Sequence, residues 1–128
     1  MSEDPAKQFS GRRYINLESY ESNGDPKLSP VQSIEHEGSL YFRTDPNSEK
    51  VQRIRVNPKV RIVPCGRSGE PAGVWVGSEA RFLEGEDYVR ASKYIKDESG
   101  LFGSLIVNLA AMAKGQKLTT IISIRLGP

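Results

Sequence analysis

The chain has 128 residues, 37% of them hydrophobic and 27% charged, and 18 Lys and Arg against 16 Asp and Glu give a formal net charge of +2. These values are typical of one soluble globular domain, and the balanced charge gives no signature of nucleic-acid binding. The single cysteine, Cys65, excludes an internal disulfide and a cysteine-based zinc cage. The longest apolar stretch, residues 101–113, is shorter than the roughly 20 residues that span a bilayer. The polar start lacks the apolar core of a secretion signal, so we expect a cytoplasmic protein without a membrane partner.

The first third of the chain predicts an antiparallel meander. Residues 1–11 are polar and are expected to form a flexible N-terminal arm, followed by a single domain over residues 12–128. Apolar and polar residues alternate over 13–22, which indicates a half-buried strand. Asn23-Gly24 is a strong hairpin signal. Pro30 in the return strand has no N–H to donate, which indicates an edge, a bulge or a strand end.

A short helix follows the third strand. Asn47 or Ser48 can cap it after Pro46, Pro58 ends it, and Val51 and Ile54 give it a narrow apolar face. The later part of the chain predicts two further helices, over 85–99 and 100–115. In total the sequence predicts about six antiparallel strands, over residues 13–22, 27–38, 39–44, 59–65, 73–84 and 117–126. The predicted fold class is therefore mainly β, a small barrel with helices.

A run of cations surrounds this short helix. Lys50 and Arg53 are three residues apart, so they project from one helix face, and Thr44 and Ser48 add hydroxyl groups beside them. A helix N-terminus offers free N–H groups and partial positive charge, so the junction is a plausible phosphate cradle. The alternative is a solvated basic helix face, since charge runs usually face water. No glycine-rich run precedes Lys50, so this is no Walker loop.

Three stretches in this order resemble one known family. They are "NGDPKLSPV" at 23–31, "LYFRT" with "SEKVQRIRVNPKVRIVPC" between 40 and 65, and "RSGEPAGVWVGSEARFLEG" at 67–85. Together they are similar to the pyridoxamine 5'-phosphate oxidase-like, flavin-binding split-barrel family, and most of all to its small branch of deazaflavin (F420)-dependent enzymes. The resemblance covers about residues 14–84.

The resemblance implies a homodimer of FMN-binding split barrels, with a flavin-like cofactor in the groove between the subunits. By position, Thr44, Ser48 and Lys50 would contact the phosphate or ribityl chain of the cofactor. The supporting cations are Arg53 and Arg55. The ring would be lined by the end of the second strand, Pro30, Val31, Gln32 and Ser33.

The sequence departs from the family pattern at two of its positions. The family often has an aromatic residue where this chain has Gln32, so the surroundings of the ring differ. Glu49 stands in the middle of the Ser-x-Lys motif, where the family usually has Gly or Arg. A carboxylate so close to an anionic site is unfavourable unless Glu49 points away from it.

Coenzyme F420 and FMN share a tricyclic ring, a ribityl chain and a phosphate, so one cradle can serve either. F420 adds an anionic tail, for which Arg55, Lys59 or Arg61 are available. The single histidine, His36, lies in a predicted hairpin and is expected to face solvent, which disfavours vitamin B6 oxidation and a metal site. Cys65 is expected to pack as a small hydrophobe.

Three hypotheses follow from the sequence. In the first, the protein is an oxidoreductase that passes hydride between F420, or FMN, and a small organic substrate. In the second, it is a non-catalytic carrier or sensor of the same cofactor. In the third, the barrel binds single-stranded nucleic acid through its cations and through Tyr41, Phe42 and Trp75. The balanced charge counts against the third, so we expect no nucleic-acid partner. No side chain is assigned a catalytic role, because a redox cofactor carries its own chemistry.

Overall fold

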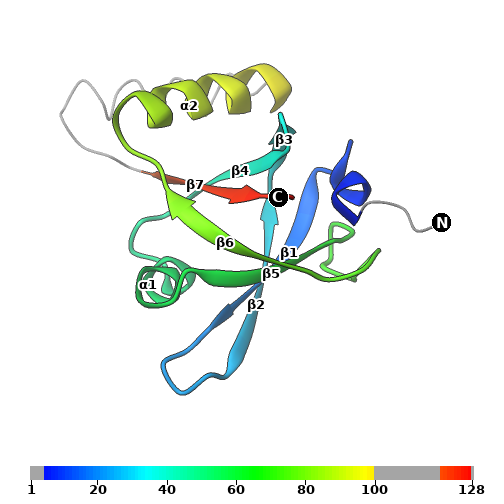
Figure 1. Cartoon of the computed structure of the whole chain (residues 1–128), viewed down its shortest axis with the longest axis vertical. Helices are drawn as coiled ribbons and strands as arrows, with labels where there is room; N and C mark the ends of the chain where they lie inside the picture. Colours follow the sequence, from blue (N-terminus) through cyan, green and yellow to red (C-terminus); the bar gives the residue numbers. More distant parts are fainter. Residues whose placement is uncertain (1–4, 100–118, 128) are drawn as a thin grey trace.

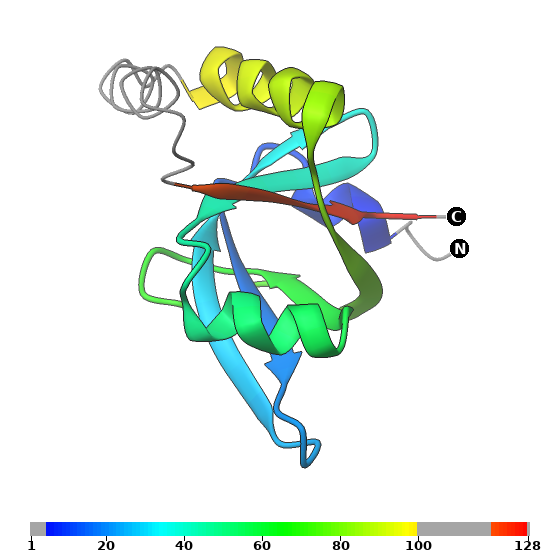
Figure 2. The same cartoon turned by 90° about the vertical axis from the view of Figure 1, so that its left-hand side faces the viewer.

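A computed structural model of the chain describes residues 5–99 and 119–127. Within them, seven antiparallel strands form one sheet in the order β2-β1-β5-β6-β7-β4-β3. The sheet curls into a split barrel, with α2 across one end and the β1–β2 hairpin projecting at the other (Figures 1 and 2). The elements are η1 (Pro5–Phe9), β1 (Tyr14–Tyr20), β2 (Pro26–Gln32), β3 (Ile34–His36), β4 (Ser39–Thr44), α1 (Glu49–Val56), β5 (Lys59–Pro64), β6 (Val76–Phe82), α2 (Gly85–Ser99) and β7 (Thr120–Arg125).

The predicted return strand is two strands, which is why the sheet has seven strands and not six. It divides at Ser33, whose N–H donates to the carbonyl of Arg13 at 2.9 Å. Before this point β2 pairs with β1, and after it β3 pairs with β4. The segment therefore supplies both edge strands of the sheet. Pro30 lies on edge strand β2, as predicted, where a missing N–H costs no ladder bond.

Two tight hairpins set the register of the edge strands. In the β1–β2 loop, the side chain of Asn23 accepts from the N–H of Asp25 at 2.9 Å, and Gly24 takes a φ of +92°. Between β3 and β4, Glu37 and Gly38 have φ of +50° and +82°. Two consecutive positive φ values are the requirement of a type I′ turn, the favoured two-residue hairpin connection.

The core fills the inside of the curled sheet. Alternate residues of β1 and β4 point inward, and α1 closes the core with Val51 and Ile54, which are buried as predicted. Full burial of each such aliphatic side chain contributes roughly 1.5–3 kcal/mol. The largest fully buried side chains are Phe9, Ile15, Leu17, Leu40, Phe42, Val51, Ile54, Val60, Ile62, Ile121, Ile122 and Ile124.

The predicted arm and helices have different outcomes. Residues 5–9 form η1, and Phe9 is completely buried in the core, because an aromatic side chain gains free energy by leaving water. The helix expected over 85–99 is α2, confirmed, and it covers Leu83 and Ile121 with Ala91. The helix expected over 100–115 lies outside the described residues. No helix among the residues described has the length and apolar character needed to cross a membrane.

An ion pair lies on the outer face of β1 and β5. Glu18 is 7% exposed, and its carboxylate accepts from Nε and Nη2 of Arg61 at 2.7 and 3.1 Å. The hydroxyl of Tyr20 donates to the same carboxylate at 2.7 Å. The bonds from Arg61, aided by Tyr20 and opposed by burial, hold the pKa of Glu18 below its usual value. The Arg61 guanidinium also lies 5.1 Å from the centre of the Trp75 ring.

Candidate functional site

Hydroxyl and amide donors meet where β4 passes into α1. Thr44 ends β4 and is buried. The next residues form a turn around Asp45. The N–H of Asn47 donates to the Asp45 side chain at 2.8 Å, and the N–H of Ser48 donates to the Asp45 carbonyl at 3.0 Å. Ser48 takes the N-cap position of α1, but its hydroxyl makes no capping hydrogen bond. Ser48 Oγ is instead buried without a hydrogen-bond partner among the described residues.

Lys50 lies beside this turn, in the first turn of α1. Its side chain is half-buried, and burial lowers the pKa of its ammonium group. The charge of Asp45 opposes this shift, and the nearby charge of Arg53 adds to it. Within residues 5–99 and 119–127, no carboxylate lies within ion-pair distance of Lys50. We refer to Thr44, Ser48 and Lys50, with the first free N–H groups of α1, as the cradle.

Two of the predicted cations have protein partners. Arg53 Nε donates to Ser19 Oγ at 2.8 Å, which fixes α1 against β1. The Arg55 guanidinium lies 4.4 Å from the centre of the Phe82 ring of β6, a cation–π contact. Arg53 therefore supports the cradle from beside it, and Arg55 packs on the sheet. Glu49, the unfavourable residue of the Ser-x-Lys motif, is exposed to solvent.

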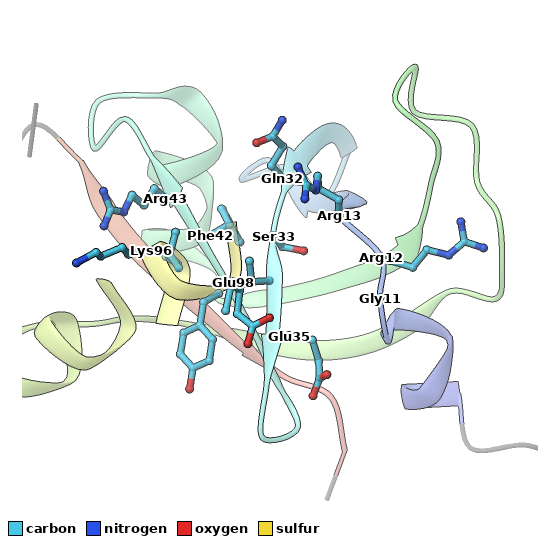
Figure 3. Close-up of a pocket in the computed structure, with 13 residues that line it drawn as sticks. Gly11, Arg12, Arg13, Gln32, Ser33, Glu35, Phe42, Arg43, Lys96 and Glu98 are labelled. Atoms are coloured by element: carbon cyan, nitrogen blue, oxygen red, sulfur yellow. The ribbon is translucent and has the colours of Figure 1, made fainter. Parts of the chain in front are cut away.

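The end of β2 places only part of the predicted ring-lining set at a cavity. Pro30 is exposed and opposite Asn16 on β1, and Val31 packs against the barrel core. Gln32 and Ser33 line a hollow of about 470 Å³ (Figure 3). Ser33 is buried, and its Oγ has no hydrogen-bond partner among the described residues.

This hollow draws its walls from four parts of the fold. They are the segment before β1 (residues 11–13), the β2–β3 junction, β4 and the end of α2. Its cations outnumber its carboxylates by four to two (Figure 3). The lining residues are Gly11, Arg12, Arg13, Gln32, Ser33, Ile34, Glu35, Tyr41, Phe42, Arg43, Ile95, Lys96 and Glu98.

Arg43 is the most deeply placed cation of the hollow. It precedes Thr44 on β4, and because successive side chains of a strand point to opposite faces, Arg43 and Thr44 lie on opposite faces of the sheet. Burial lowers the pKa of the Arg43 guanidinium, and its Nε is buried without a partner among the residues described. No role was predicted for Arg43 from the sequence. The available signal was a cation directly after the run Leu40, Tyr41 and Phe42.

The remaining predictions for single residues have mixed outcomes. Cys65 is buried, as predicted, and burial raises the pKa of its thiol. The expectation that His36 faces solvent is wrong, because its ring stacks on Tyr94 with the centroids 3.8 Å apart. The His36 side chain is 29% exposed as a result.

Comparison with known proteins identifies the fold. No protein-family model matches the sequence, and no curated protein matches it. Solved structures with the same fold include HutZ, the heme storage protein of Vibrio cholerae, at a TM-score of 0.68 and 14% identity over 92% of this chain and 84% of HutZ. An F420-H2-dependent reductase has a TM-score of 0.64 and 14% identity, covering 89% of this chain and 95% of the reductase. A pyridoxamine 5'-phosphate oxidase candidate of Listeria innocua has a TM-score of 0.59 and 17% identity, covering 88% and 82%.

The chain is therefore a split-barrel protein with a cationic surface site. Its fold is that of the pyridoxamine 5'-phosphate oxidase-like proteins that its sequence resembles. Proteins with this fold include, by their names, a heme storage protein and an F420-H2-dependent reductase. The fold alone therefore does not define the ligand of a protein that has it.

Proposed function

We propose that the protein is an oxidoreductase that binds a flavin-type cofactor, F420 or FMN, and passes hydride to or from a small organic substrate. The observation that supports this most is the position of its unsatisfied polar atoms. Four buried side-chain polar atoms lack a hydrogen-bond partner within the described residues, and three of them belong to Ser33, Arg43 and Ser48. Buried polar groups are almost always paired in a native protein, so the unpaired ones at the cradle and in the hollow favour a bound ligand.

The cradle has the donors that a cofactor phosphate needs. Among the described residues, Ser48 has a hydroxyl without a hydrogen-bond partner and Lys50 has an ammonium group without an ion pair, and the start of α1 adds amide N–H groups. Charge-assisted bonds of this kind are stronger than neutral ones. Gln32 and Ser33 would supply an amide and a hydroxyl to the polar edge of the ring. When bound, the cofactor supplies the hydride chemistry, while the chain binds it, orients it and excludes water.

The contacts of the cations bear on the choice between F420 and FMN. Of the three residues expected to hold the F420 tail, Arg55 stacks on Phe82 and Arg61 is paired with Glu18. Of these three, Lys59 alone has neither an ion pair nor a ring contact among the described residues. The preference for F420 therefore depends on the branch resemblance and not on these cations.

Heme fits the hollow less well than a flavin. Heme iron needs a His, Cys, Met or Tyr ligand. Among the described residues, neither His36 nor Cys65 lines the hollow. Tyr41 does line it, but burial raises the pKa of its phenol and so disfavours the phenolate ligand.

The proposal includes a homodimer with the cofactor at the subunit interface. The resemblance implies this arrangement, and the cradle and hollow lie at the surface of one subunit. Large aliphatic side chains are also available for an interface, with Leu28, Val56 and Val74 being 55%, 77% and 68% exposed. Light scattering on the purified protein tests this part, and a monomer at all concentrations contradicts it.

The decisive experiment is a fluorescence titration of the purified protein with FMN and with F420, in parallel. Lys50→Ala is expected to weaken binding roughly 10- to 100-fold, since it removes a charged hydrogen bond worth about 1.5–3 kcal/mol. Lys93→Ala is the matched control, because Lys93 is an exposed lysine on α2. Steady-state oxidation of the reduced cofactor then separates an enzyme from a carrier or sensor. Binding of neither cofactor contradicts the proposal.

A further inference from the structure

We propose that the hollow binds the carboxylate of an organic acid substrate, with Arg43 as its principal ligand. The inference rests on the proposed function for the reaction, and it adds the chemical class of the substrate. Among the described residues, Arg43 Nε and Ser33 Oγ are the buried polar atoms of the hollow's lining residues that have no hydrogen-bond partner. The Ser33 hydroxyl is assigned above to the cofactor ring, and the guanidinium of Arg43 is a cationic donor that suits an anionic oxygen ligand.

The position of Arg43 is costly for the protein alone. A guanidinium taken out of water loses hydration, and it normally regains free energy from a carboxylate or a set of acceptors. Arg43 has no ion-pair partner in the part of the chain that the structure describes, and its pKa is lowered by burial. A planar guanidinium matches a carboxylate with two parallel hydrogen bonds, so a carboxylate is the ligand that best satisfies it.

The other charges of the hollow favour the same ligand. Arg12, Arg13 and Lys96 bring further positive charge. Of the two carboxylates, Glu35 already accepts a hydrogen bond from the N–H of Gly38 at 3.1 Å, so it is held by the β3–β4 turn. Glu98 is exposed at the end of α2 and has no such bond to any of the described residues. The summed charge of the lining is positive, which concentrates anions at the mouth of the hollow.

The size and the apolar part of the wall define the rest of the ligand. The volume of about 470 Å³ lies within the range of small-molecule sites, roughly 300–1,000 Å³. Ile34 and Ile95 supply apolar surface, and Tyr41 supplies an aromatic ring. A cavity with an apolar wall and a half-buried cation at its side suits an aromatic acid, whose ring packs on the wall while its carboxylate reaches Arg43 (Figure 3).

The test measures binding of 2-naphthoate and of the uncharged 2-naphthamide by calorimetry, to the whole protein with and without FMN or F420. We expect 2-naphthoate to bind at least about 10-fold more tightly than the amide, from the charged hydrogen bonds. Arg43→Met is expected to abolish this difference and Arg43→Lys to keep part of it. Arg125→Met is the matched control, because Arg125 is an exposed arginine on β7 outside the hollow.

Stability and turnover give further readouts. Arg43→Met removes an unpaired half-buried charge, so its melting temperature should equal or exceed that of the wild type, which excludes misfolding as the cause of lost binding. In turnover with a naphthoquinone carboxylate, we expect the variant to raise KM about 10-fold or more while kcat changes far less.

Each outcome of the test decides between the two proposals. Equal binding of acid and amide, or no effect of Arg43→Met, overturns the substrate assignment. Loss of F420 or FMN affinity in Arg43→Met, with 2-naphthoate binding unchanged, assigns Arg43 to the cofactor and also overturns it. Binding of 2-naphthoate that depends on Arg43, in a protein that binds neither cofactor, supports the acid site and refutes the proposed function.

Discussion

Glu18 is nearly buried on β1, and replacing its carboxylate with an amide tests how much the ion pair on the outer face stabilises the barrel. Glu18→Gln removes the charge that accepts from Arg61 at 2.7 and 3.1 Å and places amide hydrogens against the guanidinium. Hydrogen bonds to charged groups are worth about 1.5–3 kcal/mol each. The Arg61 side chain is 48% exposed, so solvent screens the pair. We therefore expect a net loss of about 1–2 kcal/mol in the free energy of unfolding at neutral pH.

The stability difference between wild type and Glu18→Gln should depend on pH in a defined direction. Because the folded-state pKa of Glu18 lies below its usual 4.5, the stabilisation is complete above that value and is lost as the pH falls through the folded pKa. Urea unfolding at about pH 7 should separate wild type and Glu18→Gln, and at an acidic pH below the folded-state pKa of Glu18 the difference should shrink. Glu21→Gln is the control, since the Glu21–Lys27 pair is 44% and 52% exposed. An equal difference at both pH values would refute the electrostatic reasoning and point to packing.

Three other changes test separate features of the fold. Arg67→Met should raise the pKa of Tyr14, because a hydrogen bond from Arg67 is the main cause that lowers it; an ultraviolet titration of the tyrosinate checks this, and an unchanged value contradicts it. Glu37→Asn should stabilise the protein by up to about 1 kcal/mol, since Asn tolerates the positive φ before Gly38 better than Glu does; a lower melting temperature would contradict the turn assignment. Ile54→Ala should cost about 2–5 kcal/mol in urea unfolding, because it opens a cavity under α1; a cost near zero would mean that the helix is not packed on the core.

The sequence predicted most of the fold because its signals are local. Alternation predicted the strands, Asn23-Gly24 predicted the first hairpin, and the apolar pair Val51 and Ile54 predicted the buried face of α1. The division of the return strand at Ser33 was missed, since it depends on which strand each half pairs with. The residues of one strand do not by themselves indicate which distant strand it will pair with.

The candidate site was only partly predictable for the same reason. Thr44, Ser48 and Lys50 are close in sequence, so their meeting at one junction could be read from spacing. The hollow joins residues near 12, 33, 43 and 96, which only the folded chain brings together. The partners of Arg53 and Arg55 were also hidden, because Ser19 and Phe82 lie on strands far away in sequence.

The place of β7 in the sheet has a consequence for how the protein is made. β7 (Thr120–Arg125) is the last strand along the chain, yet it is hydrogen-bonded on both sides, to β6 and to β4. On a ribosome, the β3–β4 pair is synthesised early and must wait for these late residues before it can join the rest of the sheet. During that time Leu40 and Phe42 have no β7 against which to pack, which makes the nascent chain a natural client for chaperones. A chain truncated before residue 120 would lack β7, and β6 and β4 would each be left as an edge strand with unpaired N–H and C=O groups.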